Sequence, residues 1–309
     1  MGSGIGGAKS VVGFRAVAAL WMATLVVGLG LGAVWAAQPP PSRAQPPKTT
    51  LRLYVFDCGV LSVTTEGVER YHVTPAEVGE TRFIVPCFLI AHPRGTLMWD
   101  LGVIPDDIVE SQPQGAKSNV NPTVGAVVTR TLRGQLAQVG YRPADITYFA
   151  ISHAHIDHTA NMNQFAPSTW LTRAAERDFM WTENNPRVNP SFYTALKTSK
   201  SITMDKDEYD VFGDGQVIIK AAPGHTPGHQ VLVLQLASTG RVMLSGDLYH
   251  YPQERTLHRA PPDNEFNVQQ SAASRVTIEE YLQRTKTTLW IEHDFAANAK
   301  LKKSPAYYE

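Results

Sequence analysis

The sequence predicts a mixed α/β (α+β) fold in which two β-sheets pack face to face and helices cover their outer surfaces. Short apolar segments rich in Val, Ile, Leu and Phe recur along residues 51–309, in groups interspersed with segments of helical spacing. Histidine or aspartate directly follows several apolar segments, which places polar ligands at strand ends along one edge. Because about 260 residues is near the upper limit for one hydrophobic core, we expect a single domain.

The individual elements follow from residue type and spacing. Val and Leu recur three and four residues apart between residues 123 and 140, which predicts a helix that ends at Gly140. Two further helices are expected at residues 173–181 and 277–284. Strands are expected at residues 52–58, 83–91, 96–100, 146–152, 216–222, 230–236, 241–244 and 288–292.

Three long polar segments connect these elements: residues 104–122, 182–199 and 251–267. They are longer than ordinary connections, so we expect them to form a lid or substrate wall over the ligand-bearing edge. Trp181, Phe192 and Tyr193 lie in or beside the second segment. We expect each of them to pack onto the core, with contact to an apolar substrate as the alternative.

The N-terminal segment, residues 1–37, differs in composition from the domain. Lys9 and Arg15 form a basic start, and residues 16–37 carry no charge. The sequence Val-Trp-Ala at residues 34–36 supplies small residues at the positions that signal cleavage requires. We therefore predict a secretory signal and an exported protein, either periplasmic or secreted.

An uncleaved membrane anchor is the alternative for this segment, because its apolar run approaches the roughly 20 residues that span a bilayer. The Pro-rich residues 38–50 predict an extended linker to the domain expected at residues 51–309. A membrane partner is expected only if the N-terminal segment stays attached.

The charge balance excludes one class of partner. The 309-residue chain has 28 Lys and Arg against 28 Asp and Glu, whereas nucleic-acid binding requires basic charge that faces phosphates. We therefore expect a small-molecule partner and no nucleic acid. The oligomeric state is left open.

The chain contains two cysteines, Cys58 and Cys87, both in apolar segments that resemble strands. An exported protein could join them in a disulfide, but the sequence does not give the separation of their Cα atoms. We favour two buried free thiols, with the disulfide as the alternative, and expect neither to bind metal.

The run HAHIDH at residues 153–158 directly follows a predicted strand. Its imidazoles and carboxylate are ligands of borderline ions such as Zn²⁺. Side chains alternate along an extended backbone, so His153 and His155 can point the same way and hold one ion. The turn that follows directs Asp157 and His158 toward a second ion close by.

Further ligands stand at other strand ends. The turn PGHTPGH at residues 223–229 offers another imidazole, and Asp100, Asp247 and His293 each end an apolar segment. Each residue alone would be an ordinary cap, turn former or surface residue. In this order along the chain they predict a metal site.

Residues 51–309 resemble the metallo-β-lactamase superfamily, whose two-metal hydrolases carry HxHxDH followed by a His, an Asp and a final His. The resemblance implies an αββα sandwich and two zinc ions per chain, with iron or manganese as alternatives. One ion would be held by His153, His155 and His225. The other would be held by Asp157, His158 and His293. Asp247 would bridge both ions, and Asp100 would brace the metal-binding loop.

Within the superfamily, the chain resembles the N-acyl homoserine lactonase branch more than the main zinc β-lactamases, which carry HxHxDR and a later Cys. Shared features are LYVF at 53–56, VPCFLI at 85–90, PGHTPGHQ at 223–230 and the ending around His293. Lactonases of that branch carry a substrate-polarising Tyr three residues after the bridging Asp. Here Tyr249 stands two residues after Asp247, and His250 stands three residues after it.

The resemblance implies that hydroxide held by the two zinc ions attacks the carbonyl of a lactone. Asp157 would carry the proton to the leaving alkoxide, and Tyr249 or His250 would donate a hydrogen bond to the oxyanion. The alternative for Tyr249 is a buried structural role. His229 is expected to support its turn rather than bind metal, because the ligand set is already complete.

The expected substrates are N-acyl homoserine lactones, whose hydrolysis is quorum quenching. A same-fold hydrolase of another ester, a thioester or a β-lactam is the alternative, because the zinc cluster alone does not separate these bonds. A non-hydrolytic di-iron protein is a further alternative, because it would use nearly the same ligands.

Overall fold

The computed structural model describes residue 1, residues 50–112 and residues 114–309. The predicted secretory signal, and the linker up to residue 49, lie outside the described residues apart from Met1. None of the helices in the described ranges has the length and apolar character that a membrane span requires.

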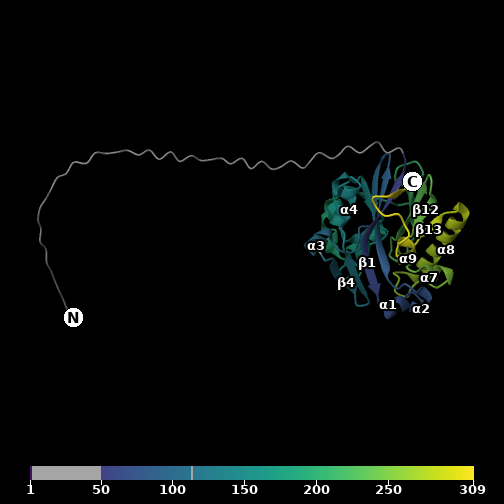
Figure 1. The fold of residues 1–309 in the computed structure, drawn as a ribbon, viewed down its shortest axis with the longest axis horizontal. Coiled ribbons are helices and arrows are strands. Elements are labelled where there is room, and N and C mark those ends of the chain that lie inside the picture. The colour runs from purple at the N-terminus through teal and green to yellow at the C-terminus, as the bar shows by residue number, and fades with distance from the viewer. Residues whose placement is uncertain (2–49, 113) are drawn as a thin grey trace. The chain divides into compact units, whose positions relative to one another are not determined.

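Two β-sheets lie between two layers of helices, as Figure 1 shows with α3 and α4 on one side and α8 on the other. The larger sheet has the order β4-β5-β1-β2-β3-β6-β7-β8, and β14 also pairs with β1. Its strands are β1 (Arg52–Val63), β2 (Phe83–His92), β3 (Gly95–Trp99), β4 (Ala116–Asn121), β5 (Val124–Val128), β6 (Tyr148–Ala150), β7 (Thr169–Thr172), β8 (Ser201–Thr203) and β14 (Tyr307–Tyr308).

The second sheet has the order β13-β12-β11-β10-β9. Its strands are β9 (Glu208–Asp210), β10 (Val217–Ala221), β11 (Gln230–Leu236), β12 (Gly240–Leu244) and β13 (Thr288–Trp290). The described α-helices are α1 (Thr65–Glu69), α2 (Pro75–Val78), α3 (Asp106–Ser111), α4 (Leu132–Gln138), α5 (Ile156–Thr159), α6 (Ala174–Met180), α7 (Pro252–Thr256), α8 (Val268–Thr285) and α9 (Phe295–Asn298).

Alternation along the strands builds the layers. In β1, Leu53 and Val55 belong to the apolar cluster between the two sheets, whereas Phe56 belongs to the cluster on the opposite face. In β11, Leu232 faces the other sheet while Val233 packs with Ile278 and Leu282 of α8. Since successive side chains point to opposite faces, each strand contributes to two cores.

The helix expected at residues 123–140 is wrong in its first part. Residues 124–128 form β5, which pairs antiparallel with both β1 and β4, and α4 begins only at Leu132. Thr131 caps α4 by accepting a hydrogen bond from the backbone of Gly134. The β-branched valines of this segment suit a strand, and their pairing with β1 is a long-range contact that local spacing does not reveal.

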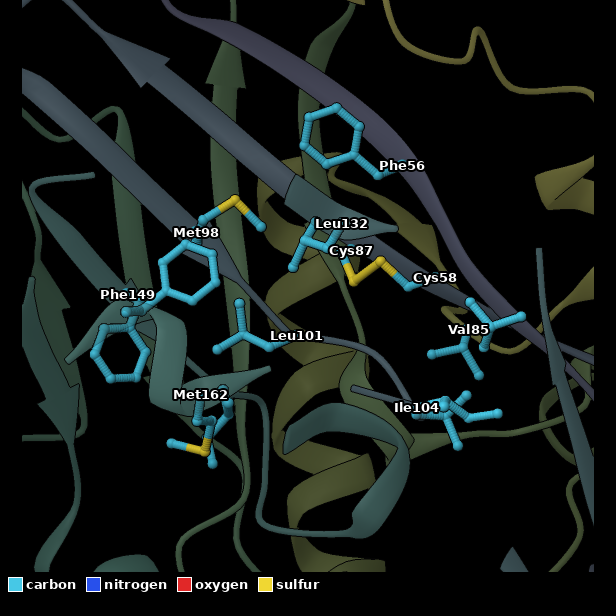
Figure 2. Packing of buried hydrophobic residues seen from close by; sticks show 14 of the residues in the cluster. Phe56, Cys58, Val85, Cys87, Met98, Leu101, Ile104, Leu132, Phe149 and Met162 are labelled. Atoms are coloured by element: carbon cyan, nitrogen blue, oxygen red, sulfur yellow. A yellow bond between two sulfur atoms is a disulfide. The ribbon is translucent and has the colours of Figure 1, made fainter. Parts of the chain in front are cut away.

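The expectation of two free thiols is also wrong, because Cys58 and Cys87 form a disulfide with their Cα atoms 5.9 Å apart (Figure 2). The bond joins β1 to its antiparallel neighbour β2, beside a register shift between Asp57 and Val60. Its sulfur atoms lie in the apolar cluster that contains Phe56. Strand register therefore decides the pairing, and composition does not show it.

Candidate metal centre

The first group of predicted ligands converges from three loops at strand ends. His153 and His155 follow β6, His225 follows β10, and Asp247 follows β12. The Nε2 atoms of His153 and His225 lie 2.9 and 3.0 Å from Nδ1 of His155. One donor atom from each of these four residues lies within 4.8 Å of all the others.

The second group contains Asp157 and His158 in α5 and His293 in the loop after β13. Its donor atoms also lie within 4.8 Å of one another. Oδ2 of Asp157 is 3.7 Å from Nε2 of His158 and 3.5 Å from Nε2 of His293. The structure therefore brings all the ligands predicted from the sequence to one place.

Asp247 lies between the two groups. Its Oδ1 atom is 3.1 Å from Nε2 of His293 and 3.3 Å from Nε2 of His158. Its Oδ2 atom is 3.4 Å from Nε2 of His225 and 3.5 Å from Nε2 of His153. One carboxylate oxygen thus faces each group, which is the arrangement of a bridging ligand.

Asp100 supports the centre from behind. In the turn after β3, where its φ is 55°, it accepts hydrogen bonds from Nδ1 of His158 at 2.9 Å and from Oγ of Ser152 at 2.8 Å. Its other oxygen accepts from the backbone N of Ser152 at 2.6 Å. These bonds fix the ring of His158 and leave its Nε2 atom for the centre.

The remaining rings are oriented in the same way. Nδ1 of His293 donates to the carbonyl of Ile84 at 2.8 Å, and Nδ1 of His225 donates to Glu265 at 3.0 Å. His229 is not placed as a ligand. Its Nδ1 donates to a carbonyl at 2.9 Å, and its Nε2 accepts from the backbone N of Asp247 at 2.9 Å.

Glu176, which sequence reasoning missed, ties two of the ligand loops together. Its buried carboxylate accepts from the backbone N of Ala154 at 2.6 Å, from Oγ of Thr226 at 2.7 Å and from the backbone N of Gly228 at 2.7 Å. A Cβ atom at Gly228 would lie 2.6 Å from Cβ of Glu176, so glycine is needed for this close approach. No local pattern marks Glu176 in the sequence.

The electrostatics of the centre favour cations. Burial lowers the pKa of His153 and His155 well below the usual range, which keeps them in the neutral form that binds metals. Burial alone would also lower the pKa of His158 and of His225. The negative charges of Asp100 and Asp247 outweigh the effect of burial and hold the pKa of His158 well above its usual range. The negative charge of Glu265 likewise raises the pKa of His225 to about 10.

Three side-chain atoms of the ligand residues are buried without a hydrogen-bond partner among the described residues: Nε2 of His155, Nε2 of His158 and Oδ1 of Asp247. Buried polar atoms normally have partners, because leaving them unpaired costs free energy. Imidazole and carboxylate donors that face one another in this way fit divalent metal ions.

A pocket of about 380 Å³ opens above the centre. Its floor contains His155, Asp157, His225, Asp247, His250 and His293. Each of the three long polar segments contributes to the wall, which includes Val120, Pro122 and Val124 of the β4–β5 hairpin, Pro186 and Arg187, and Asn264. Trp181, Phe192 and Tyr193 instead pack on the apolar core, as expected.

The two candidate hydrogen-bond donors after Asp247 lie in different places. His250 lines the pocket, with Nε2 3.1 Å from Oδ2 of Asp247. Tyr249 lies in the cluster under α8, and its hydroxyl donates to Glu279 at 3.2 Å. Because its hydroxyl is bound there, Tyr249 does not face the pocket.

Tyr71, which was not singled out from the sequence, also lines the pocket. It lies between β1 and β2, and its ring centroid is 4.3 Å from that of His250. Burial and the charges of Asp247 and Glu254 raise the pKa of Tyr71 well above the usual range, so the hydroxyl remains protonated.

Known proteins are similar to this chain in sequence and in fold. Residues 81–281 match a family model described as the metallo-beta-lactamase superfamily. The N-acyl homoserine lactonase AttM of Azorhizobium caulinodans is 28% identical over 269 residues, which cover 84% of this chain and 100% of that protein.

Two solved structures have the same fold. An N-acyl homoserine lactone hydrolase, with the product N-hexanoyl-L-homoserine bound at its catalytic metal centre, matches with a TM-score of 0.70 at 21% identity, over 84% of this chain and 100% of that chain. The dizinc quorum-quenching lactonase AidC, also in complex with a product, matches with a TM-score of 0.58 at 17% identity. The match covers 84% of this chain and 94% of that chain. The predicted αββα sandwich is thereby confirmed.

Proposed function

The chain belongs to the metallo-beta-lactamase superfamily and is a metal-dependent hydrolase, and we propose that it opens the ring of N-acyl homoserine lactones. The position of Asp247 between two groups of ligands is the observation that carries the hydrolytic proposal. The lactonase relatives support the choice of substrate class.

We assign two divalent ions to the centre. The first would bind His153, His155, His225 and Asp247. The second would bind Asp157, His158, His293 and Asp247. Zinc is the proposed metal because its usual donors are imidazole and carboxylate, and iron and manganese are the alternatives.

Once bound, the ions would supply a Lewis acid that acidifies water and polarises a carbonyl oxygen. Asp157, whose side chain is 12% exposed, lies at the floor of the pocket, where it can take a proton and pass it to the leaving alkoxide. His250 lies within hydrogen-bond distance of Asp247, so we propose that His250 orients the Asp247 carboxylate.

The pocket suits a substrate with a polar head and an apolar tail. Polar groups converge at the floor, while Leu61, Val120 and Val124 supply apolar wall. Phe266, whose backbone N donates to the carbonyl of His225, is 55% exposed and packs edge-on against Phe179. Apolar walls with few polar groups are typical of small-molecule sites.

The proposal is tested by a substrate panel. Ring opening of N-hexanoyl and N-decanoyl homoserine lactones is followed beside hydrolysis of a chromogenic β-lactam, a glutathione thioester and an aryl ester, with the chelator-treated protein as the control. The lactones are expected to have the highest kcat/KM. Efficient cleavage of another substrate, with lactones no faster than in the control, would contradict the lactonase proposal.

We also propose that residues 1–37 direct export. The basic start, the apolar run and the small residues at 34–36 support this, and the Cys58–Cys87 disulfide adds support because disulfides persist in oxidising compartments. Fractionation and N-terminal sequencing should find an exported chain that begins near residue 37. A full-length cytoplasmic product would contradict export, and a full-length product in the membrane would support the anchor.

A further inference from the structure

The hydroxyl of the half-buried Tyr71 differs from those of three buried tyrosines. Tyr193 donates to the carbonyl of Met180, Tyr249 donates to Glu279, and Tyr251 donates to the carbonyl of Thr81. Tyr71 lines the pocket, and its hydroxyl has no hydrogen bond to any residue in the described part of the chain. A polar group held at a pocket without a protein partner is available to a ligand.

Aromatic neighbours on several sides hold the ring of Tyr71. It lies edge-on to Phe83 at 5.6 Å and to Tyr251 at 5.5 Å, and 4.3 Å from His250. Such contacts limit movement of the side chain, so the phenolic oxygen is held in one position. A fixed donor can stabilise developing charge without reorganisation.

The same neighbours connect Tyr71 to the second group of ligands. The ring of Phe83 stacks on His293 at 4.9 Å, and the ring of His250 stacks on His293 at 5.7 Å. Tyr71 therefore stands on the side of the pocket where His293 completes the floor. His250 already faces Asp247, which leaves Tyr71 as an uncommitted donor beside it.

We propose that Tyr71 is a catalytic residue, whose hydroxyl donates a hydrogen bond to the carbonyl oxygen of the bound ester and to the oxyanion that develops there. This inference rests on the proposed function. In the lactonase branch that the chain resembles, this donor is a Tyr three residues after the bridging Asp. Here Tyr71, in the connection between β1 and β2, would supply the donor instead. No bond to Tyr71 forms or breaks, and its proton remains on the hydroxyl.

The test compares Tyr71→Phe with Tyr148→Phe in the metal-loaded protein. Both substitutions remove one hydroxyl from a half-buried tyrosine, and Tyr148 lies in β6 and packs against Phe212 between the sheets. We measure kcat and KM for N-hexanoyl homoserine lactone and for 4-nitrophenyl acetate, together with metal content and thermal denaturation.

Loss of the donor is expected to lower kcat about 10- to 100-fold for Tyr71→Phe, with KM nearly unchanged, because the bond strengthens as charge develops. Metal content and unfolding temperature should match those of Tyr148→Phe. A kcat equal to that of Tyr148→Phe would overturn the inference. A loss of kcat that follows loss of metal or of stability would also overturn it, since it would indicate a structural role.

The two substrates separate this inference from the proposed function. If the wild type cleaves the aryl ester but not the lactone, the lactonase proposal fails, and Tyr71 is judged on kcat for the aryl ester. If the wild type opens the lactone and Tyr71→Phe is as fast, the lactonase proposal stands and the inference fails. A metal-loaded wild type that cleaves neither ester overturns both.

Discussion

The floor and the wall of the pocket are built differently. At the floor, Asp247 and His293 are at most 4% exposed, and hydrogen bonds from behind hold the ring of His293 and the backbone of Asp247. In the wall, Pro122 and Pro186 are exposed. A floor residue therefore cannot change without disturbing its neighbours, whereas a wall residue can. The difference suggests that the floor determines the chemistry and the wall determines which substrate fits.

The largest effect is expected at the centre of the floor. Asp247→Ala removes the carboxylate that faces both ligand groups, so hydrolysis should fall to the level of the metal-free protein. Elemental analysis should show fewer than two ions per chain. Asp107→Ala is the control, because this aspartate lies on α3 with its side chain 87% exposed. Full activity of Asp247→Ala would show that the chemistry lies elsewhere.

A smaller effect is expected behind the floor. Asp100→Asn keeps an acceptor for the backbone of Ser152 and tolerates the positive φ, but it weakens the bond from Nδ1 of His158. Loss of such a brace typically lowers metal affinity about 10- to 100-fold. Competition with a chelator measures the metal affinity. An unchanged affinity would show that Asp100 does not support metal binding.

The wall should show a different pattern. Val120→Ala removes apolar contact worth about 1 kcal/mol, so KM for a decanoyl lactone should rise about fivefold, while kcat and metal content stay constant. A butanoyl lactone should be affected less. Asn119→Ala is the control, because Asn119 directly precedes Val120 in β4 and its side chain is exposed. An equal effect on both lactones would mean that this part of the wall does not contact the acyl chain.

The smallest effect on activity is expected at Tyr249, outside both regions. Tyr249→Phe removes the hydrogen bond to Glu279, which Arg255 still holds, and should lower the free energy of unfolding by about 1 kcal/mol. Lactone hydrolysis should be unchanged. Denaturant unfolding measures the free energy of unfolding, and initial rates measure lactone hydrolysis. A large loss of kcat would show that the Tyr249 hydroxyl contributes to the reaction.

The floor could be predicted from the sequence because its ligands directly follow strands. The run at residues 153–158 supplies four of them within six positions, and His225, Asp247 and His293 each mark the end of a strand or the turn after it. A strand end is a local feature, and parallel or packed strands bring such ends to one edge. The resemblance to the metallo-β-lactamase superfamily then predicted which residues would share an ion.

The wall and the supporting residues could not be predicted in this way. The strand at residues 124–128 depends on pairing with β1, so local spacing suggested a helix instead. Glu176 and Tyr71 reach the site through tertiary packing, and no motif marks either residue. The disulfide depends on the register between β1 and β2. Each of these features is a contact between segments far apart in the chain.

The most direct test of the two-ion centre is a metal titration of the chelator-treated protein, with the rate of N-hexanoyl homoserine lactone opening measured after each addition of zinc. Six ligands arranged around the carboxylate of Asp247 predict that the rate rises to a clear break at two equivalents per chain. Full activity at one equivalent, with no further gain and no second ion bound, would contradict the account of Asp247 as a bridge.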